Sequence, residues 1–63
     1  MNEFGRYCLM MFRIKRDSHW TAMCRYRHTK DEAMLRVAKI YRLEAHEYAQ
    51  KAREHGYGKR IAA

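Results

Sequence analysis

Two segments in the first half of the chain alternate apolar and polar residues with a period of two. In residues 8–14 the even positions are all apolar, and the odd positions become basic towards the end of the segment. Residues 20–26 repeat the pattern, again with apolar even positions. Because side chains alternate between the two faces of a strand, the pattern predicts strands over residues 6–15 and 20–27. The polar residues 16–19 between them favour the turn of a β-hairpin.

The second half of the chain follows a helical period instead. Apolar residues recur at spacings of four and three, and the set is Met34, Ala38, Tyr41, Ala45, Tyr48 and Ala52. Thr29, followed by Glu32 three residues later, predicts a capping box and a helix that begins at Lys30. Gly56 stands where a left-handed C-terminal cap is expected, so the predicted helix covers residues 30–55.

Together these elements predict an α+β fold, in which a β-hairpin is followed by one long C-terminal α-helix packed on one face of the hairpin. The alanines of the helix would allow close approach to a sheet whose inner face is bulky, with Phe12, Trp20 and Tyr26. Residues 57–63 are predicted to be a loose tail. With 63 residues, the chain is expected to form a single domain over residues 1–63.

The basic residues indicate an anionic partner. Fourteen Lys and Arg residues against seven acidic residues leave a net charge of +7, and nine of the cations are arginine. In the predicted hairpin, Arg13, Lys15, Arg25 and Arg27 project from the outer face of the sheet. Arginine makes paired hydrogen bonds to phosphate and stacks on flat rings. This face therefore predicts binding to the backbone of DNA or RNA.

Apolar residues near these cations leave a second class of partner open. Four residues lie outside the predicted core, and we predict them to form a protein interface: Met11, Met23, Ile40 and Leu43. The alternative function is a small inhibitor or adaptor, of the kind that phages and mobile elements encode, which binds an acidic surface of a larger host protein. A chain this short also has a marginal core, which predicts a homodimer.

The residues that carry chemistry do not form a catalytic or metal-binding motif. His46 and Glu47 begin a zinc-protease pattern, but Gln50 stands where the second histidine would be required. Cys8 and Cys24 are sixteen residues apart and lack the closely spaced partner ligands of a zinc site. The order hairpin–helix is similar to that of HNH-type nucleases, but paired carboxylates are missing. We therefore expect a binding protein that is not an enzyme and needs no metal or cofactor.

The chain carries no pattern typical of export or of membrane insertion. Glu3 comes early, and the apolar run over residues 7–12 ends at Arg13, which is too short for a signal peptide. A spanning helix would need roughly 20 predominantly apolar residues. The two cysteines suit a reducing compartment. These observations predict a cytoplasmic protein without a membrane partner.

Overall fold

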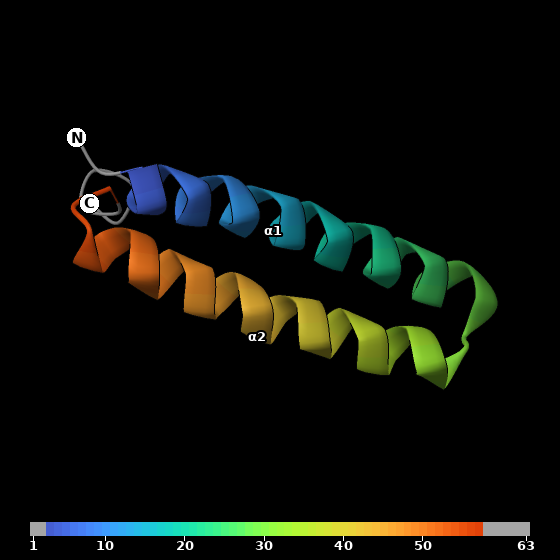
Figure 1. Cartoon of the computed structure of the whole chain (residues 1–63). Helices are drawn as coiled ribbons and strands as arrows, with labels where there is room; N and C mark the ends of the chain where they lie inside the picture. The colour runs from blue at the N-terminus through green and yellow to red at the C-terminus, as the bar shows by residue number, and fades with distance from the viewer. Residues whose placement is uncertain (1–2, 58–63) are drawn as a thin grey trace.

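The computed structural model describes residues 3–57, which form a helical hairpin (Figure 1). Helix α1 is Glu3–Thr29 and helix α2 is Glu32–Glu54. The helices lie side by side and run antiparallel, so the first turn of α1 is next to the last turn of α2. The hairpin measures 43 × 21 × 12 Å and contains no strand within residues 3–57.

The predicted α+β fold is wrong, because both predicted strands are parts of α1. Residues 6–15, the predicted turn over residues 16–19 and residues 20–27 form one continuous helix. Residues 6–55 contain neither glycine nor proline, the two residues that most readily interrupt a helix. The predicted helix over residues 30–55 is confirmed as α2, which begins two residues later and ends one residue earlier.

The residues of α1 that face α2 recur with a helical period, but polar residues stand among the apolar ones in this stripe. Residues spaced by three and four along α1 form the stripe that runs beside α2: Gly5, Cys8, Phe12, Lys15, His19, Ala22 and Tyr26. This is the spacing of a coiled coil, in which every such position meets the facing helix. The alternation in residues 8–14 does not mark a buried face, since Met10 and Ile14 are 53% and 48% exposed.

The two helices meet through small side chains. Gly5, Cys8 and Ala22 of α1 are buried, as are the three alanines that recur every seventh residue of α2, Ala38, Ala45 and Ala52. The predicted apolar stripe of α2 is therefore confirmed as its packed face, with its larger members half-buried. A Cβ atom at Gly5 would lie only 2.7 Å from the ring of Tyr57. The core is thin, and its largest fully buried side chain is that of Cys8.

The C-terminal cap of α2 is confirmed at Gly56. This glycine has a φ of 90°, and its backbone N–H donates to the carbonyl of Arg53 at 2.9 Å. The N–H of Tyr57 donates to the carbonyl of Ala52, also at 2.9 Å. The pair of bonds forms a Schellman motif, which satisfies carbonyls that the last helical turn leaves without partners.

The predicted capping box is wrong, because Thr29 belongs to α1. Its hydroxyl donates to the carbonyl of Arg25 at 2.9 Å. Asp31 is the N-cap of α2 instead, and its carboxylate accepts a hydrogen bond from the N–H of Ala33 at 2.9 Å. Between them Lys30 adopts a left-handed conformation with φ 58°, and its N–H donates to the carbonyl of Tyr26 at 2.7 Å. The hairpin turn thus uses two residues, Lys30 and Asp31.

Replacing Lys30 by glycine is expected to stabilise the hairpin by about 0.5–1 kcal/mol. A left-handed conformation costs a residue with a Cβ about 1–2 kcal/mol, part of which the greater chain entropy of unfolded glycine offsets. Chemical denaturation followed by circular dichroism measures the change. Lys39→Gly is the control, because the same substitution at an exposed position inside α2 should destabilise by about 1 kcal/mol. Equal losses at both positions would contradict the expectation.

Candidate nucleic-acid interface

The four cations predicted to bind nucleic acid all lie on α1, but they do not form one cluster. Lys15 lies in the stripe beside α2, where its ammonium is 3.5 Å from the carboxylate of Glu44 and 5.4 Å from the ring centre of Tyr41. Arg25 is exposed on the same side of the hairpin as Tyr41. Arg13 and Arg27 are fourteen residues apart, or about 21 Å along the helix. The basic sheet face predicted from these four residues therefore does not exist.

The four residues predicted as a protein interface are also dispersed. Met11 and Met23 are half-buried on opposite flanks of the α1 stripe. Ile40 and Leu43 are 57% and 63% exposed on α2, and helical spacing turns Leu43 directly away from α1. The prediction that Ile40 and Leu43 lie outside the packed stripe agrees with this exposure. Their predicted role in binding stays a prediction.

A groove of about 380 Å³ runs between the helices along one edge of the hairpin. Its floor is apolar and is formed mainly by Leu9, Phe12, Ala45, Ala49 and Ala52. Its rim carries Arg16, Trp20, Arg42, His46 and Arg53, with His19 at one end. We call this surface, floor and rim together, the basic groove.

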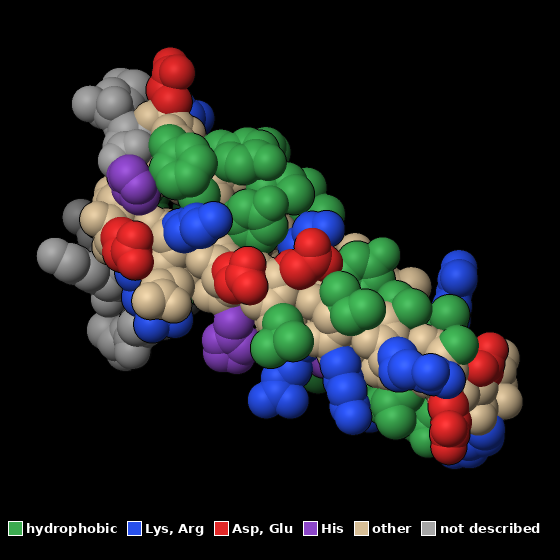
Figure 2. Space-filling model, turned by 60° about the horizontal axis from the view of Figure 1, so that its bottom comes forward, with side chains coloured by type: hydrophobic (Ala, Val, Ile, Leu, Met, Phe, Trp, Pro, Cys, Tyr) green, Lys and Arg blue, Asp and Glu red, His purple; other side chains and the backbone are tan. Residues whose placement is uncertain are grey.

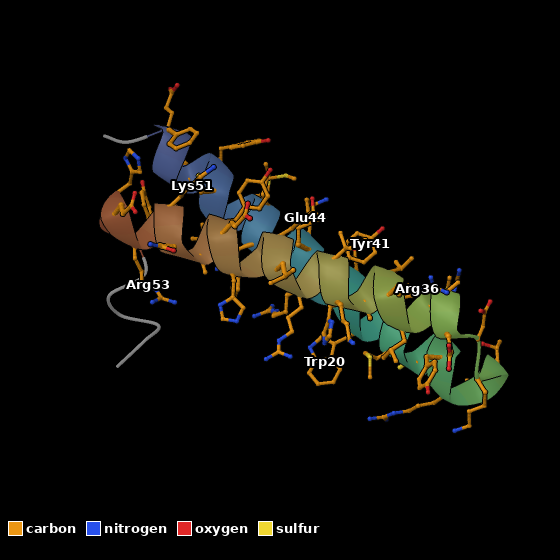
Figure 3. All side chains as sticks on the ribbon, turned by 90° about the horizontal axis from the view of Figure 1, so that it is seen from below. Trp20, Arg36, Tyr41, Glu44, Lys51 and Arg53 are labelled. Carbon is orange, nitrogen blue, oxygen red and sulfur yellow. The ribbon has the colours of Figure 1, made fainter. Side chains whose placement is uncertain are left out.

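The described lining of the basic groove carries cations and no acid, although Asp17 lies beside it, 3.8 Å from the Arg16 guanidinium. No Asp or Glu is among the described residues that line it, whereas three arginines and two histidines are. Figure 3 shows Trp20 and Arg53 projecting from one edge of the hairpin and Glu44 and Tyr41 from the other. In Figure 2, acidic side chains lie along the front of α2, and basic side chains protrude at the lower border. The two edges of the hairpin therefore differ in charge composition, because the opposite edge carries Glu44 together with Lys15 and Arg25.

Helical spacing extends the positive edge beyond the groove. Arg13 precedes Arg16 by three residues on α1, and Lys39 precedes Arg42 by three residues on α2. Residues three apart share a helix face, so both side chains continue the rim. Both residues are exposed. Of the predicted cations, Arg13 is the one that adjoins the basic groove most closely.

Contacts within the hairpin position part of the rim. The Arg16 guanidinium lies 5.4 Å from the ring centre of Phe12, which holds it at the groove wall. Its ion pair with Asp17 is long, at 3.8 Å, and exposed, so it contributes little. The Nδ1–H of His19 donates to the carbonyl of Ala38 at 2.9 Å and ties this end of the groove to α2. A carbonyl only accepts hydrogen bonds, so this contact requires a proton on Nδ1.

Sequence reasoning missed the residues that form the rim. Arg16 lies in the predicted turn and Trp20 on the inner face of the predicted sheet, whereas in the structure both line the groove and Trp20 is 57% exposed. Arg42 and Arg53 were not singled out. A signal was present, because Arg42, His46, Ala49 and Arg53 follow each other at spacings of four, three and four without an acid among them. It became visible only once α1 was known to be a helix that supplies the other wall.

Three aromatic side chains, those of Phe4, Tyr7 and Tyr48, gather at the opposite edge, near the open end of the hairpin. The rings of Phe4 and Tyr7 are 6.3 Å apart, and those of Tyr7 and Tyr48 are 6.2 Å apart. A hydrogen bond between the two tyrosine hydroxyls raises the pKa of Tyr48 above its ordinary 10.0. The ring of Phe4 also meets that of His55 edge-on at 5.1 Å. These contacts hold the ends of the two helices together.

Within residues 3–57, no group of three or more His, Cys, Asp or Glu side chains is placed to hold a metal ion. Within the same residues, neither helix has an apolar stretch of the length that crossing a membrane requires. Comparisons of the chain with protein-family models, with curated proteins and with solved structures gave no match.

Proposed function

We propose that the protein is a non-catalytic binding module that holds nucleic acid in the basic groove through contacts with the phosphate backbone. The observation that carries this proposal is the segregation of charge. The described lining of the groove contains Arg16, Arg42 and Arg53 and no acid, although the chain has seven acidic residues. A polyanion placed there would meet three arginines, with Asp17 beside Arg16 as a neighbouring acid.

The spacing of the arginines suits a chain of phosphates better than a single anion. Arg42 and Arg53 are eleven residues apart on α2, which is about 16 Å along the helix. Arg16 faces them from α1 across the apolar floor. Arginine donates paired hydrogen bonds to phosphate oxygens, so each side chain offers one backbone contact. A ligand that engages all three must therefore be extended and carry repeated negative charge.

Salt dependence tests this proposal. Fluorescence anisotropy of labelled oligonucleotides, single-stranded and duplex, is measured from low to physiological salt. Three phosphate contacts predict that log Ka falls against log salt concentration with a slope of about −2 to −3. Binding that is absent even at low salt, or that does not change with salt, would contradict the proposal.

The apolar floor favours a second candidate function, in which the groove binds an acidic amphipathic helix of a larger host protein. Two packed helices with an apolar seam form a common receptor for a third helix. Basic rims would then pair with acidic residues that flank the apolar face of that helix. This inhibitor or adaptor replaces the first proposal if an acidic amphipathic peptide binds at physiological salt and no oligonucleotide does.

We further propose that two copies of the chain associate through the edge opposite the basic groove. Phe4, Tyr7, Ile14 and Ile40 are each between 45% and 57% exposed. The packing contacts of Phe4 and Tyr7, and the helical spacing of the two isoleucines, place them on the side of Glu44 and Tyr41. Figure 2 shows apolar side chains gathered along the first half of α1. Such exposure, beside a core of small residues, is typical of a surface that a partner covers.

Sedimentation equilibrium is expected to show a particle of twice the 7.7 kDa chain mass. The midpoint of thermal unfolding should also rise with protein concentration, because association stabilises the folded state by mass action. Ile14→Glu combined with Ile40→Glu should give a monomer. Cys24→Glu is the control, since Cys24 is exposed on α1 and lies ten residues, about 15 Å, from Ile14. A single-chain mass and a constant midpoint would contradict the association.

The two thiols support the proposal that the protein works in a reducing compartment such as the cytoplasm. Cys8 is buried and Cys24 is exposed, and neither is in a disulfide. They are sixteen residues apart on one straight helix, about 24 Å, which no disulfide can bridge. Cys8 instead packs as a small apolar side chain against α2.

A further inference from the structure

We propose that the basic groove selects single-stranded nucleic acid, with an unpaired base stacked on the indole of Trp20 and the phosphates on the arginines of the rim. This inference rests on the proposed function and specifies its substrate class. It is carried by the combination of an exposed aromatic ring, an apolar floor and a basic rim in one groove.

Trp20 is placed as a stacking platform. It is the only tryptophan of the chain, and its side chain is 57% exposed although it lines a groove with an apolar floor. The rings of His19 and Trp20 meet at an angle of 65°, so they do not stack on each other. Figure 3 shows Trp20 projecting from the edge of the hairpin. Exposed aromatic rings of this kind bind single strands by stacking on successive bases.

The cations around Trp20 are placed to hold the sugar-phosphate chain of that base. Arg16 precedes Trp20 by four residues, which puts both on one face of α1. Arg42 lines the groove from α2 beside them. A base stacked on the indole would leave its 5′ and 3′ phosphates on either side of the ring, within reach of long arginine side chains. The phosphate contacts of the arginines and the base stacking on Trp20 therefore come from neighbouring residues in the same groove.

A duplex would use only half of this surface. Paired bases are stacked inside a duplex and present phosphates and groove edges to a protein. The rim arginines would contact those phosphates, but Trp20 and the floor around Phe12 and Ala49 would gain no base to cover them. A single strand, or an unpaired loop of RNA, offers base faces as well as phosphates. The apolar part of the groove therefore distinguishes the two kinds of nucleic acid.

The fluorescence of Trp20 tests the inference directly, because no other tryptophan contributes. The full chain is titrated at about 150 mM salt with a 15-nucleotide oligo-dT, with oligo-U and with the dT·dA duplex. We expect single strands to quench the indole and to bind at least about tenfold more tightly than the duplex. Equal affinity for duplex and single strand, or binding of single strands without a change in indole fluorescence, would overturn it.

Substitution of Trp20 separates this inference from the proposed function. Trp20→Ala should weaken single-strand binding by about ten- to a hundredfold in an anisotropy assay and leave duplex binding unchanged, while Trp20→Phe should retain most of the affinity. Circular dichroism checks that the helices remain, as expected at an exposed position. Undiminished single-strand binding by Trp20→Ala overturns the stacking but leaves the function. Absence of binding to every oligonucleotide overturns both.

Discussion

Replacing Arg16, Arg42 and Arg53 together by glutamate is expected to raise the Kd for nucleic acid by at least about a thousandfold at physiological salt. A hydrogen bond to a charged group contributes about 1.5–3 kcal/mol, and three such contacts are lost. The substitution also reverses the sign of the groove, so a phosphate chain would meet repulsion where it met attraction. All three residues line the basic groove and none is in the packed stripe, so the helical hairpin should persist.

A matched variant distinguishes the groove from the overall charge. Arg25, Arg36 and Lys51 are exposed, and none of them lines the basic groove. Replacing these three by glutamate changes the net charge of the protein by the same amount. Its Kd is expected to rise by less than about tenfold, through the weaker long-range potential alone. If both triple variants lose binding equally, the phosphates are held by diffuse charge and the groove is not the site.

Replacing Ala38 by leucine is expected to destabilise the hairpin by about 3 kcal/mol. Ala38 is 1% exposed and lies where the helices pack through small side chains. Additional methylenes in a well-packed interface cost about 1–3 kcal/mol, and a hairpin has no second core layer that could absorb the strain. Separation of the helices would also break the hydrogen bond from His19 to the carbonyl of Ala38.

Urea denaturation followed by circular dichroism measures this effect. Ala33→Leu is the control, because Ala33 is exposed in the first turn of α2 and leucine is a good helix former. The control is expected to stay within about 0.5 kcal/mol of the parent protein. An Ala38→Leu protein as stable as the parent would show that the helices do not need a small residue at this position.

The second helix was predictable because every residue of its packed stripe is apolar, which makes the helical period easy to recognise. Alanine and tyrosine alternate through its stripe, Gly56 marks the end, and no polar residue interrupts the face. The first helix was not predicted, because Lys15 and His19 occupy two positions of its stripe. Both bond to α2 across the interface, Lys15 to Glu44 and His19 to the carbonyl of Ala38. From the sequence alone, a polar residue whose hydrogen bond or ion pair is made with the facing helix cannot be distinguished from a polar residue that faces water.

The error in the fold displaced the predicted site. In a strand, Arg13, Lys15, Arg25 and Arg27 would share the outer face, because every second residue does. In a helix each residue advances by about 100°, so Arg13 and Arg27 turn to one side, Arg25 turns to another, and Lys15 enters the interface. The inference of an anionic partner from the net charge does not depend on the fold and stays a proposal. The binding site that we propose for this partner lies at the edge that carries Arg16, Arg42 and Arg53.

The amino-acid sequence alone predicts where α2 lies, its alanine-rich packed face, its glycine cap and the excess of positive charge. These properties depend on local spacing and composition, which act without reference to the rest of the chain. Contacts between the helices are needed to establish that α1 is a helix, that small residues bring the helices together and that cations from both helices border one groove. Those properties depend on which residues meet across the hairpin, and contacts such as those of Lys15 and His19 exist only after the chain has folded back on itself.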